Sequence, residues 1–223
     1  IPFVVNNKQI YLPFMALYLQ ERCNAETFPN EEILPSAQVL LLYFIYNGTV
    51  EITTSQVAKE LGLTPTSISR ASRQLEKLGL IQTMKTGKQK IIHSDSSPKE
   101  LFERTQQKLL NPVKKTVYIP KTCVTSELLE SGYFALAHYT MLNVPQIKCF
   151  AIDSISRWKD VMTNNLLDSE NQMAVEMWRY NPHLLSKEDK VDELSLALSL
   201  RDDADERVEA AVDEMLEKLW GKI

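Results

Sequence analysis

The segment 53–79 constrains the fold more than any other, because it marks the beginning and the end of two adjacent helices. Each helix has a threonine before its first turn and a glycine after its last: Thr53 and Gly62 for the helix 55–61, and Thr64 and Gly79 for the helix 65–78. A threonine hydroxyl accepts the free N–H groups of a first turn, and glycine takes the left-handed conformation that ends a helix. Gln56 completes a capping-box pattern with Thr53, and Pro65 suits a first helical position. Because only residues 62–64 join the two helices, they predict a helix-turn-helix.

The second helix is predicted to have one apolar and one polar face. Its apolar stripe has helical spacings of three, four and three, and consists of Ile68, Ala71, Leu75 and Leu78. The opposite face carries almost only hydrogen-bond donors: Thr66, Ser67, Ser69, Arg70, Arg73, Gln74 and Lys77. Hydroxyl and guanidinium groups near a helix start reach base edges in the major groove of DNA, whereas Arg73 and Lys77 lie further along and suit phosphates. We therefore predict that these seven residues contact DNA.

A basic hairpin is predicted directly after this helix. Two short strands, 80–86 and 88–94, flank Gly87. Lys85, Lys88 and Lys90 surround the turn without an acid between them, which suits phosphates or the minor groove. Residues 51–93 contain seven Lys or Arg against three acids, a balance of +4, whereas the remainder of the chain carries −8. This local reversal of sign favours a nucleic-acid partner for this segment.

The stretch QVAKELGLTPTSISRASRQLEKLGLI, residues 56–81, followed by the basic hairpin, resembles the winged helix-turn-helix of MarR-type transcriptional regulators. The resemblance covers about residues 36–93. It implies base reading by Thr66, Ser67, Ser69 and Arg70, and a wing that contacts DNA through Lys85, Lys88 and Lys90. The tip departs from the family, whose wings carry an Asp-x-Arg element where this chain has Thr-Gly-Lys-Gln-Lys, so the arginine contact is not carried over. The 130 residues after His93 also exceed the terminal dimer helices of that family.

Two further elements are predicted before this segment. A helix over 8–23 has Pro13 in its first turns, and Ser36 is positioned to cap a helix 37–47 that Asn47-Gly48 ends. A short strand is expected over 49–53. Residues 1–93 are therefore expected to form a winged helix DNA-binding domain with N-terminal helices.

The second half, residues 94–223, is predicted to be a small α/β domain ending in a helical hairpin, which makes the fold class α+β. Ser97, Pro98 and Glu100 have the pattern of a capped helix to about residue 110. The other expected elements are strands at 114–120, 146–153 and 172–180, helices at 126–142 and 154–162, and a final helix pair at 191–200 and 204–220. Asp203 and Glu206 have the pattern that begins the last helix.

Catalytic signatures are absent from this half, so we expect no enzyme, no cofactor and no metal. His93, His138 and His183 lie far apart without a metal-binding spacing. The acidic run 201–206 lacks the calcium-loop pattern, and helix capping explains it. The aromatic residues of this half suit core packing, a ligand cavity or a partner surface.

The cell compartment is predicted from the cysteines and the hydropathy. The three cysteines form no C-x-x-C pair, which is typical of a reducing cytoplasm. The longest apolar run, 39–46, is far shorter than the roughly 20 residues of a membrane span. We therefore expect a cytoplasmic protein without a membrane partner.

The main functional hypothesis is a sequence-specific transcriptional regulator, most simply a repressor. It is expected to bind double-stranded DNA as a homodimer, with residues 65–78 in the major groove and 80–93 on the backbone. The second half would sense a small-molecule effector or bind a protein partner. The alternative is an antitoxin or adaptor, because a winged helix followed by an α/β domain is similar in layout to type IV toxin–antitoxin antitoxins, and SGYFALAHYTML, residues 131–142, resembles one of their helices. An enzyme with an appended winged helix is the third hypothesis.

Overall fold

The computed structural model describes residues 3–5, 9–12, 17–20, 32–48, 51–87 and 89–223, and divides the chain into two compact units, Ile1–Glu31 and Glu32–Ile223. The first unit contains the strands β1 (Phe3–Val5), β2 (Gln9–Leu12) and β3 (Leu17–Gln20), which pair antiparallel in that order. The helix predicted over 8–23 is therefore wrong. Its two short apolar runs flank Pro13, and runs of this length fit a strand as well as a helix.

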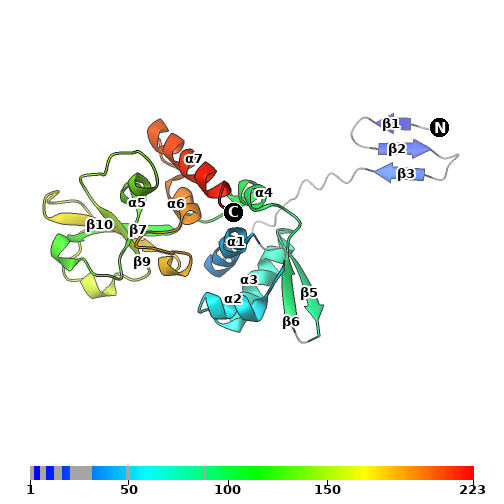
Figure 1. The fold of residues 1–223 in the computed structure, drawn as a ribbon, viewed down its shortest axis with the longest axis horizontal. Coiled ribbons are helices and arrows are strands. Elements are labelled where there is room, and N and C mark those ends of the chain that lie inside the picture. The colour runs from blue at the N-terminus through cyan, green and yellow to red at the C-terminus, as the bar shows by residue number, and fades with distance from the viewer. Residues whose placement is uncertain (1–2, 6–8, 13–16, 21–31, 49–50, 88) are drawn as a thin grey trace. The chain divides into compact units, whose positions relative to one another are not determined.

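The second unit is a mixed α+β structure (Figure 1). Its first part contains two consecutive helices, one further helix and three strands. The elements in order are α1 (Pro35–Asn47), β4 (Glu51–Thr53), α2 (Thr54–Glu60), α3 (Pro65–Lys77), β5 (Gln82–Thr86) and β6 (Gln89–His93). The three strands form an antiparallel sheet in the order β4-β6-β5. The predicted hairpin is thus present, and β4 extends it to a sheet.

Local capping sets the bounds of these helices. The Thr53 hydroxyl accepts from the Gln56 backbone N–H at 3.2 Å, and the Thr64 hydroxyl accepts from the Ser67 N–H at 3.1 Å. Both threonine caps are confirmed, but the capping box predicted for Thr53 and Gln56 is wrong, because the Gln56 side chain donates to Glu60 instead. The predicted Ser36 cap is wrong, because Leu34 is the N-cap of α1 and Pro35 occupies its first turn, where no backbone donor is needed.

The apolar stripe of α3 faces the core of this part. Ile68, Ala71 and Leu75 are fully buried, while Leu78, the last member of the predicted stripe, is half-buried. The stripe packs against α1, which also contacts the following helix, α4 (Pro98–Thr105). Because one side of α3 is held by α1, its other side is left for solvent or a partner.

The remainder of the second unit is a four-stranded mixed sheet with helices around it. Its elements are α4, β7 (Val113–Pro120), β8 (Leu129–Glu130), α5 (Gly132–Tyr139), β9 (Cys149–Ile152), β10 (Gln172–Trp178), α6 (Glu193–Leu200) and α7 (Glu206–Trp220). The strand order is β7-β10-β9-β8, with β9 and β10 parallel and the other pairs antiparallel. The predicted strands and the final helix pair are therefore present.

Several predicted bounds in this part are wrong. The helix expected over 126–142 is only α5, since β8 precedes it, and the helix expected over 154–162 is a single 3-10 turn, Ser156–Trp158. The N-cap of α7 is Asp205 rather than Asp203. The helix that starts with the Ser97–Glu100 capping box ends at Thr105 instead of near 110.

Buried polar contacts connect the parts on either side of residue 93. The Gln38 side chain of α1 donates to the Leu110 carbonyl at 3.0 Å and accepts from the Leu110 N–H at 2.6 Å. The Tyr46 hydroxyl, also on α1, donates to Asp192 at 2.9 Å. The division by contacts accordingly falls between Glu31 and Glu32 and not at residue 93.

Within the residues that the structure describes, none of the helices has the length and apolar character that a membrane crossing requires.

Candidate nucleic-acid interface

The outward face of α3 carries the polar residues that the sequence singled out. The turn 61–64 joins α2 to α3, and α2 packs against α3 from the side. The exposed side chains on the free face are Thr66, Ser69, Arg70, Arg73 and Lys77. They run from the first turn of α3 to its last, so the hydroxyls lie near the positive end of the helix and the cations follow.

The cations of this face have no partner inside the described part of the chain. Arg70, Arg73 and Lys77, together with Lys85 on β5, make no side-chain hydrogen bond or ion pair there. An unpaired surface cation keeps its charge available for an external anion. Four such groups on two adjacent elements make a positive surface, which we call the α3–β5 cationic face.

Two of the three acids in the segment 51–93 accept hydrogen bonds from internal donors. Glu76 on α3 accepts from the Thr83 hydroxyl on β5 at 2.5 Å, which ties the hairpin to the helix. Glu60 accepts from the Tyr43 hydroxyl and from Gln56, and the Tyr43 hydrogen bond is the main reason that the pKa of Glu60 lies below its usual value. These two carboxylates are therefore occupied, whereas the cations of the α3–β5 cationic face are not.

The hairpin places two lysines opposite each other. Lys85 on β5 pairs in register with Lys90 on β6, so the two side chains share a face of the sheet. Lys90 is half-buried and its ammonium donates to the Ser72 hydroxyl of α3 at 3.1 Å. Like charges directly opposite repel, and an anion beside Lys85 would relieve that repulsion. Lys90 thus holds the hairpin against α3, and Lys85 remains exposed.

Two other predicted residues are engaged within the protein. The Gln74 amide accepts from the Leu34 N–H at 2.8 Å and donates to the Glu32 carbonyl at 3.0 Å. The Ser67 hydroxyl lies 2.9 Å from the Thr64 hydroxyl, inside the cap of α3. Both side chains have their hydrogen bonds satisfied locally, which leaves them less available to DNA. Lys88 lies outside the described residues.

Ser72 also belongs to this site, although it was not predicted from the sequence. It is fully buried on α3 and receives the Lys90 ammonium. A buried serine between Ala71 and an arginine gives no sign in the sequence of the strand lysine that it meets, so no local pattern identifies it.

The three histidines contact different partners. His93 contacts Asp95 at 2.7 Å, His138 contacts Glu130, and His183 contacts the Glu127 carbonyl at 3.0 Å. Burial is the main cause that raises the pKa of the Cys149 thiol well above its usual value. No group of three or more potential metal-ligating His, Cys, Asp or Glu side chains occurs among the residues that were placed.

Neither the protein-family models, nor the curated proteins, nor the solved structures contain a match to this chain.

Proposed function

We propose that this chain is a sequence-specific DNA-binding transcriptional regulator with a winged helix-turn-helix, most simply a repressor. In this proposal α3 enters the major groove, α2 crosses the backbone, and the β5–β6 hairpin is the wing. The observation that carries it is the α3–β5 cationic face, whose four cations lack hydrogen-bond or ion-pair partners among the described residues although exposed acids are plentiful there.

The roles within the site follow from position along α3. Thr66, Ser69 and Arg70 lie in its first half and are assigned to base edges. Arg73 and Lys77 lie further along and are assigned to phosphates, as is Lys85 on the wing. Gln74 and Lys90 are assigned to holding the site together, because their polar atoms already have internal partners.

A homodimer is part of the proposal, since one winged helix reads few base pairs and two-fold symmetry doubles the contacts. The test is selection of bound duplexes from a random DNA pool by the full chain. A palindromic consensus with two half-sites about one helical turn apart is expected. Recovery of random sequences, with affinity set only by length, would reject sequence-specific binding.

A second candidate function is an antitoxin or adaptor whose second half holds a protein partner. It is favoured by exposed apolar side chains in the loops of that half, among them Met141 at 91% exposure and Leu167 at 75%. The variant Met141→Ser/Leu167→Ser tests it. Loss of a stoichiometric co-purifying protein with unchanged DNA binding is expected under this function, and no such partner under the first.

A further inference from the structure

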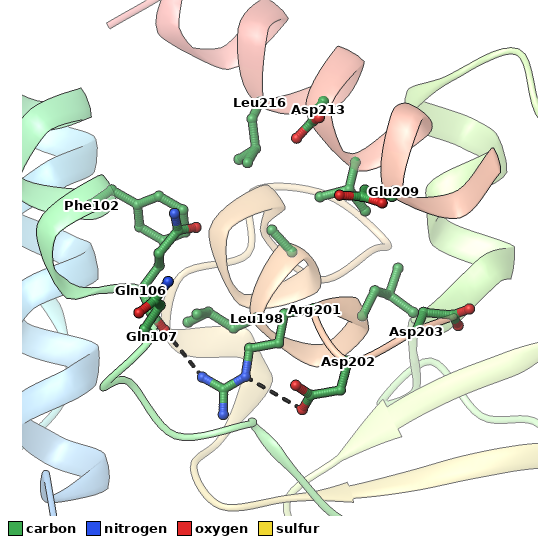
Figure 2. A pocket seen from close by; sticks show the side chains of 13 residues that line it. Phe102, Gln106, Gln107, Leu198, Arg201, Asp202, Asp203, Glu209, Asp213 and Leu216 are labelled. Carbon is green, nitrogen blue, oxygen red and sulfur yellow. Dashed lines mark hydrogen bonds and ion pairs between the residues drawn. The ribbon is translucent and has the colours of Figure 1, made fainter. Parts of the chain in front are cut away.

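A pocket of about 600 Å³ lies in the second half of the chain, away from α3 (Figure 2). Its walls come from α4, from the end of α6 and from α7. In Figure 2, Phe102 of α4 and Leu198 of α6 lie on one side of the cavity, and Leu216, Asp213 and Glu209 line it from α7. A volume of this size is typical of small-molecule sites, which run from about 300 to 1,000 Å³.

Part of the pocket wall is apolar but only half-buried. The core-facing residues of α7 are buried and are Val208, Ala211, Met215 and Leu219. Val212 and Leu216 lie beside that stripe, line the pocket and stay half-buried. These two side chains offer apolar surface to an occupant, whereas Phe102 behind them is almost fully buried and packs on Trp220, with the ring centroids 5.8 Å apart.

The rim of the pocket is acidic. Two of its four carboxylates already have partners, since Asp202 lies 3.5 Å from Arg201 and Asp203 accepts from the Tyr133 hydroxyl. Arg201 is committed to the wall, because its guanidinium also donates to the Gln106 carbonyl at 3.1 Å and to the Leu109 carbonyl at 2.5 Å. Arg201, the one cation that lines the pocket, is therefore engaged by backbone carbonyls of the wall, and the rim remains negative.

Glu209 and Asp213 are the two remaining carboxylates, and neither has a side-chain partner among the described residues. They stand four residues apart on α7, so they are neighbours on one helix face. Like charges at this spacing destabilise a helix. A cation between them would remove that repulsion.

We propose that this pocket binds a small organic cation with an aliphatic stem, of the polyamine class. Its ammonium groups would pair with Glu209 and Asp213, while its methylene groups cover the half-buried Val212 and Leu216. A bare divalent ion would leave the apolar wall uncovered and would favour a cluster of three or more oxygen ligands, which the described residues do not form. The binding goes beyond the proposed function and does not depend on it.

The experiment is isothermal titration of the full chain with spermidine at about 0.15 M salt, without DNA. Saturable 1:1 binding is expected. The variant Glu209→Gln/Asp213→Asn keeps the shape of the pocket and should weaken spermidine binding about tenfold or more, because two ion pairs are lost. The matched variant Glu206→Gln/Glu214→Gln removes the same charge from the same helix outside the pocket and should leave binding unchanged.

Two further ligands separate the charge from the stem. Mg²⁺ supplies charge without an aliphatic chain and should not displace spermidine at equal concentration, and neutral 1,8-octanediol should bind far more weakly than spermidine. Equal weakening in both double variants would mean a general attraction to acidic surface and would overturn the proposal. Displacement by Mg²⁺, or absence of saturable binding in a wild-type chain that unfolds cooperatively, would overturn it too.

Discussion

The cations of the α3–β5 cationic face differ from three cations of the second half in whether they have an ion-pair partner. In the second half, Lys99 pairs with Glu217 at 2.8 Å, Arg207 with Asp205 at 2.7 Å and Lys218 with Glu214 at 2.5 Å. On α3, Arg70 and Arg73 are exposed and have no such partner within the described chain. A surface that leaves its cations unpaired in a net acidic protein is suited to an external anion, whereas these three cations of the second half are neutralised within the chain.

The largest effect that this comparison predicts is on DNA affinity. Arg70→Ala/Arg73→Ala should weaken binding to the selected duplex by about 100-fold or more, because a base contact and a phosphate contact are lost. The variant Arg207→Ala/Lys218→Ala removes the same charge from the paired group and should bind as the wild type does. Fluorescence anisotropy measures both, and equal losses would remove the distinction between the two regions.

The second prediction concerns stability, for which Arg201, with its internal partners, is expected to matter more than Arg70. Arg201→Ala should lower the free energy of unfolding by about 1–2 kcal/mol, since the carbonyls of Gln106 and Leu109 lose a charged donor. Arg70→Ala should change it by less than about 0.5 kcal/mol, because no side-chain hydrogen bond or ion pair of the described residues is lost. Urea unfolding compares them, and a destabilised Arg70→Ala would show that this side chain has an internal role.

The third prediction concerns the wing. Lys85→Ala should weaken DNA binding about fivefold without changing the preferred sequence, as expected for a phosphate contact. Repeating the random-pool selection with the variant checks the second half of this statement. A changed consensus would show that Lys85 contacts bases rather than the DNA backbone.

The smallest effect at neutral pH is expected for the buried carboxyl Asp192. Burial raises its pKa, and one of its oxygens is buried without a hydrogen-bond partner. Because the folded-state pKa is above the unfolded one, the contribution of this group to stability is complete below the unfolded pKa and is lost as the pH rises through the folded pKa.

Asp192→Asn removes that titration. The new amide N–H₂ lacks a partner, so we expect a net change within about 1 kcal/mol at pH 7. The difference in free energy of unfolding, variant minus wild type, should increase from pH 4 to pH 7. A difference that stays constant over this range would show that Asp192 ionises as easily in the folded chain as in the unfolded one.

Elements with local signals were predictable. Thr53, Thr64 and Ser97 mark helix starts through bonds to residues three positions away, so their sequence neighbourhood contains the whole interaction. The hairpin and the buried stripe of α3 were predictable for the same reason. The start of α5 could also have been predicted, from the glycine at position 132. Gly132 has a φ of +54°, which favours glycine, and α5 begins there, so the longer helix expected over 126–142 does not form.

Features that depend on distant residues were not predictable. On a helical wheel Gln74 falls on the same broad polar face as Arg73, and only the folded chain brings Leu34 to its amide. The same holds for Lys90, whose partner Ser72 lies on another element. The helix expected over 8–23 failed because short apolar runs fit both helical and strand periodicity.

The most direct test of the central claim is the salt dependence of DNA affinity for the wild type and for Arg73→Ala/Lys77→Ala/Lys85→Ala. If these three cations each neutralise a phosphate, the slope of log K against log salt should become shallower by about 2.7, or about 0.9 for each contact. Arg207→Ala/Lys218→Ala should keep the wild-type slope. An unchanged slope in the triple variant would show that the α3–β5 cationic face does not meet the duplex.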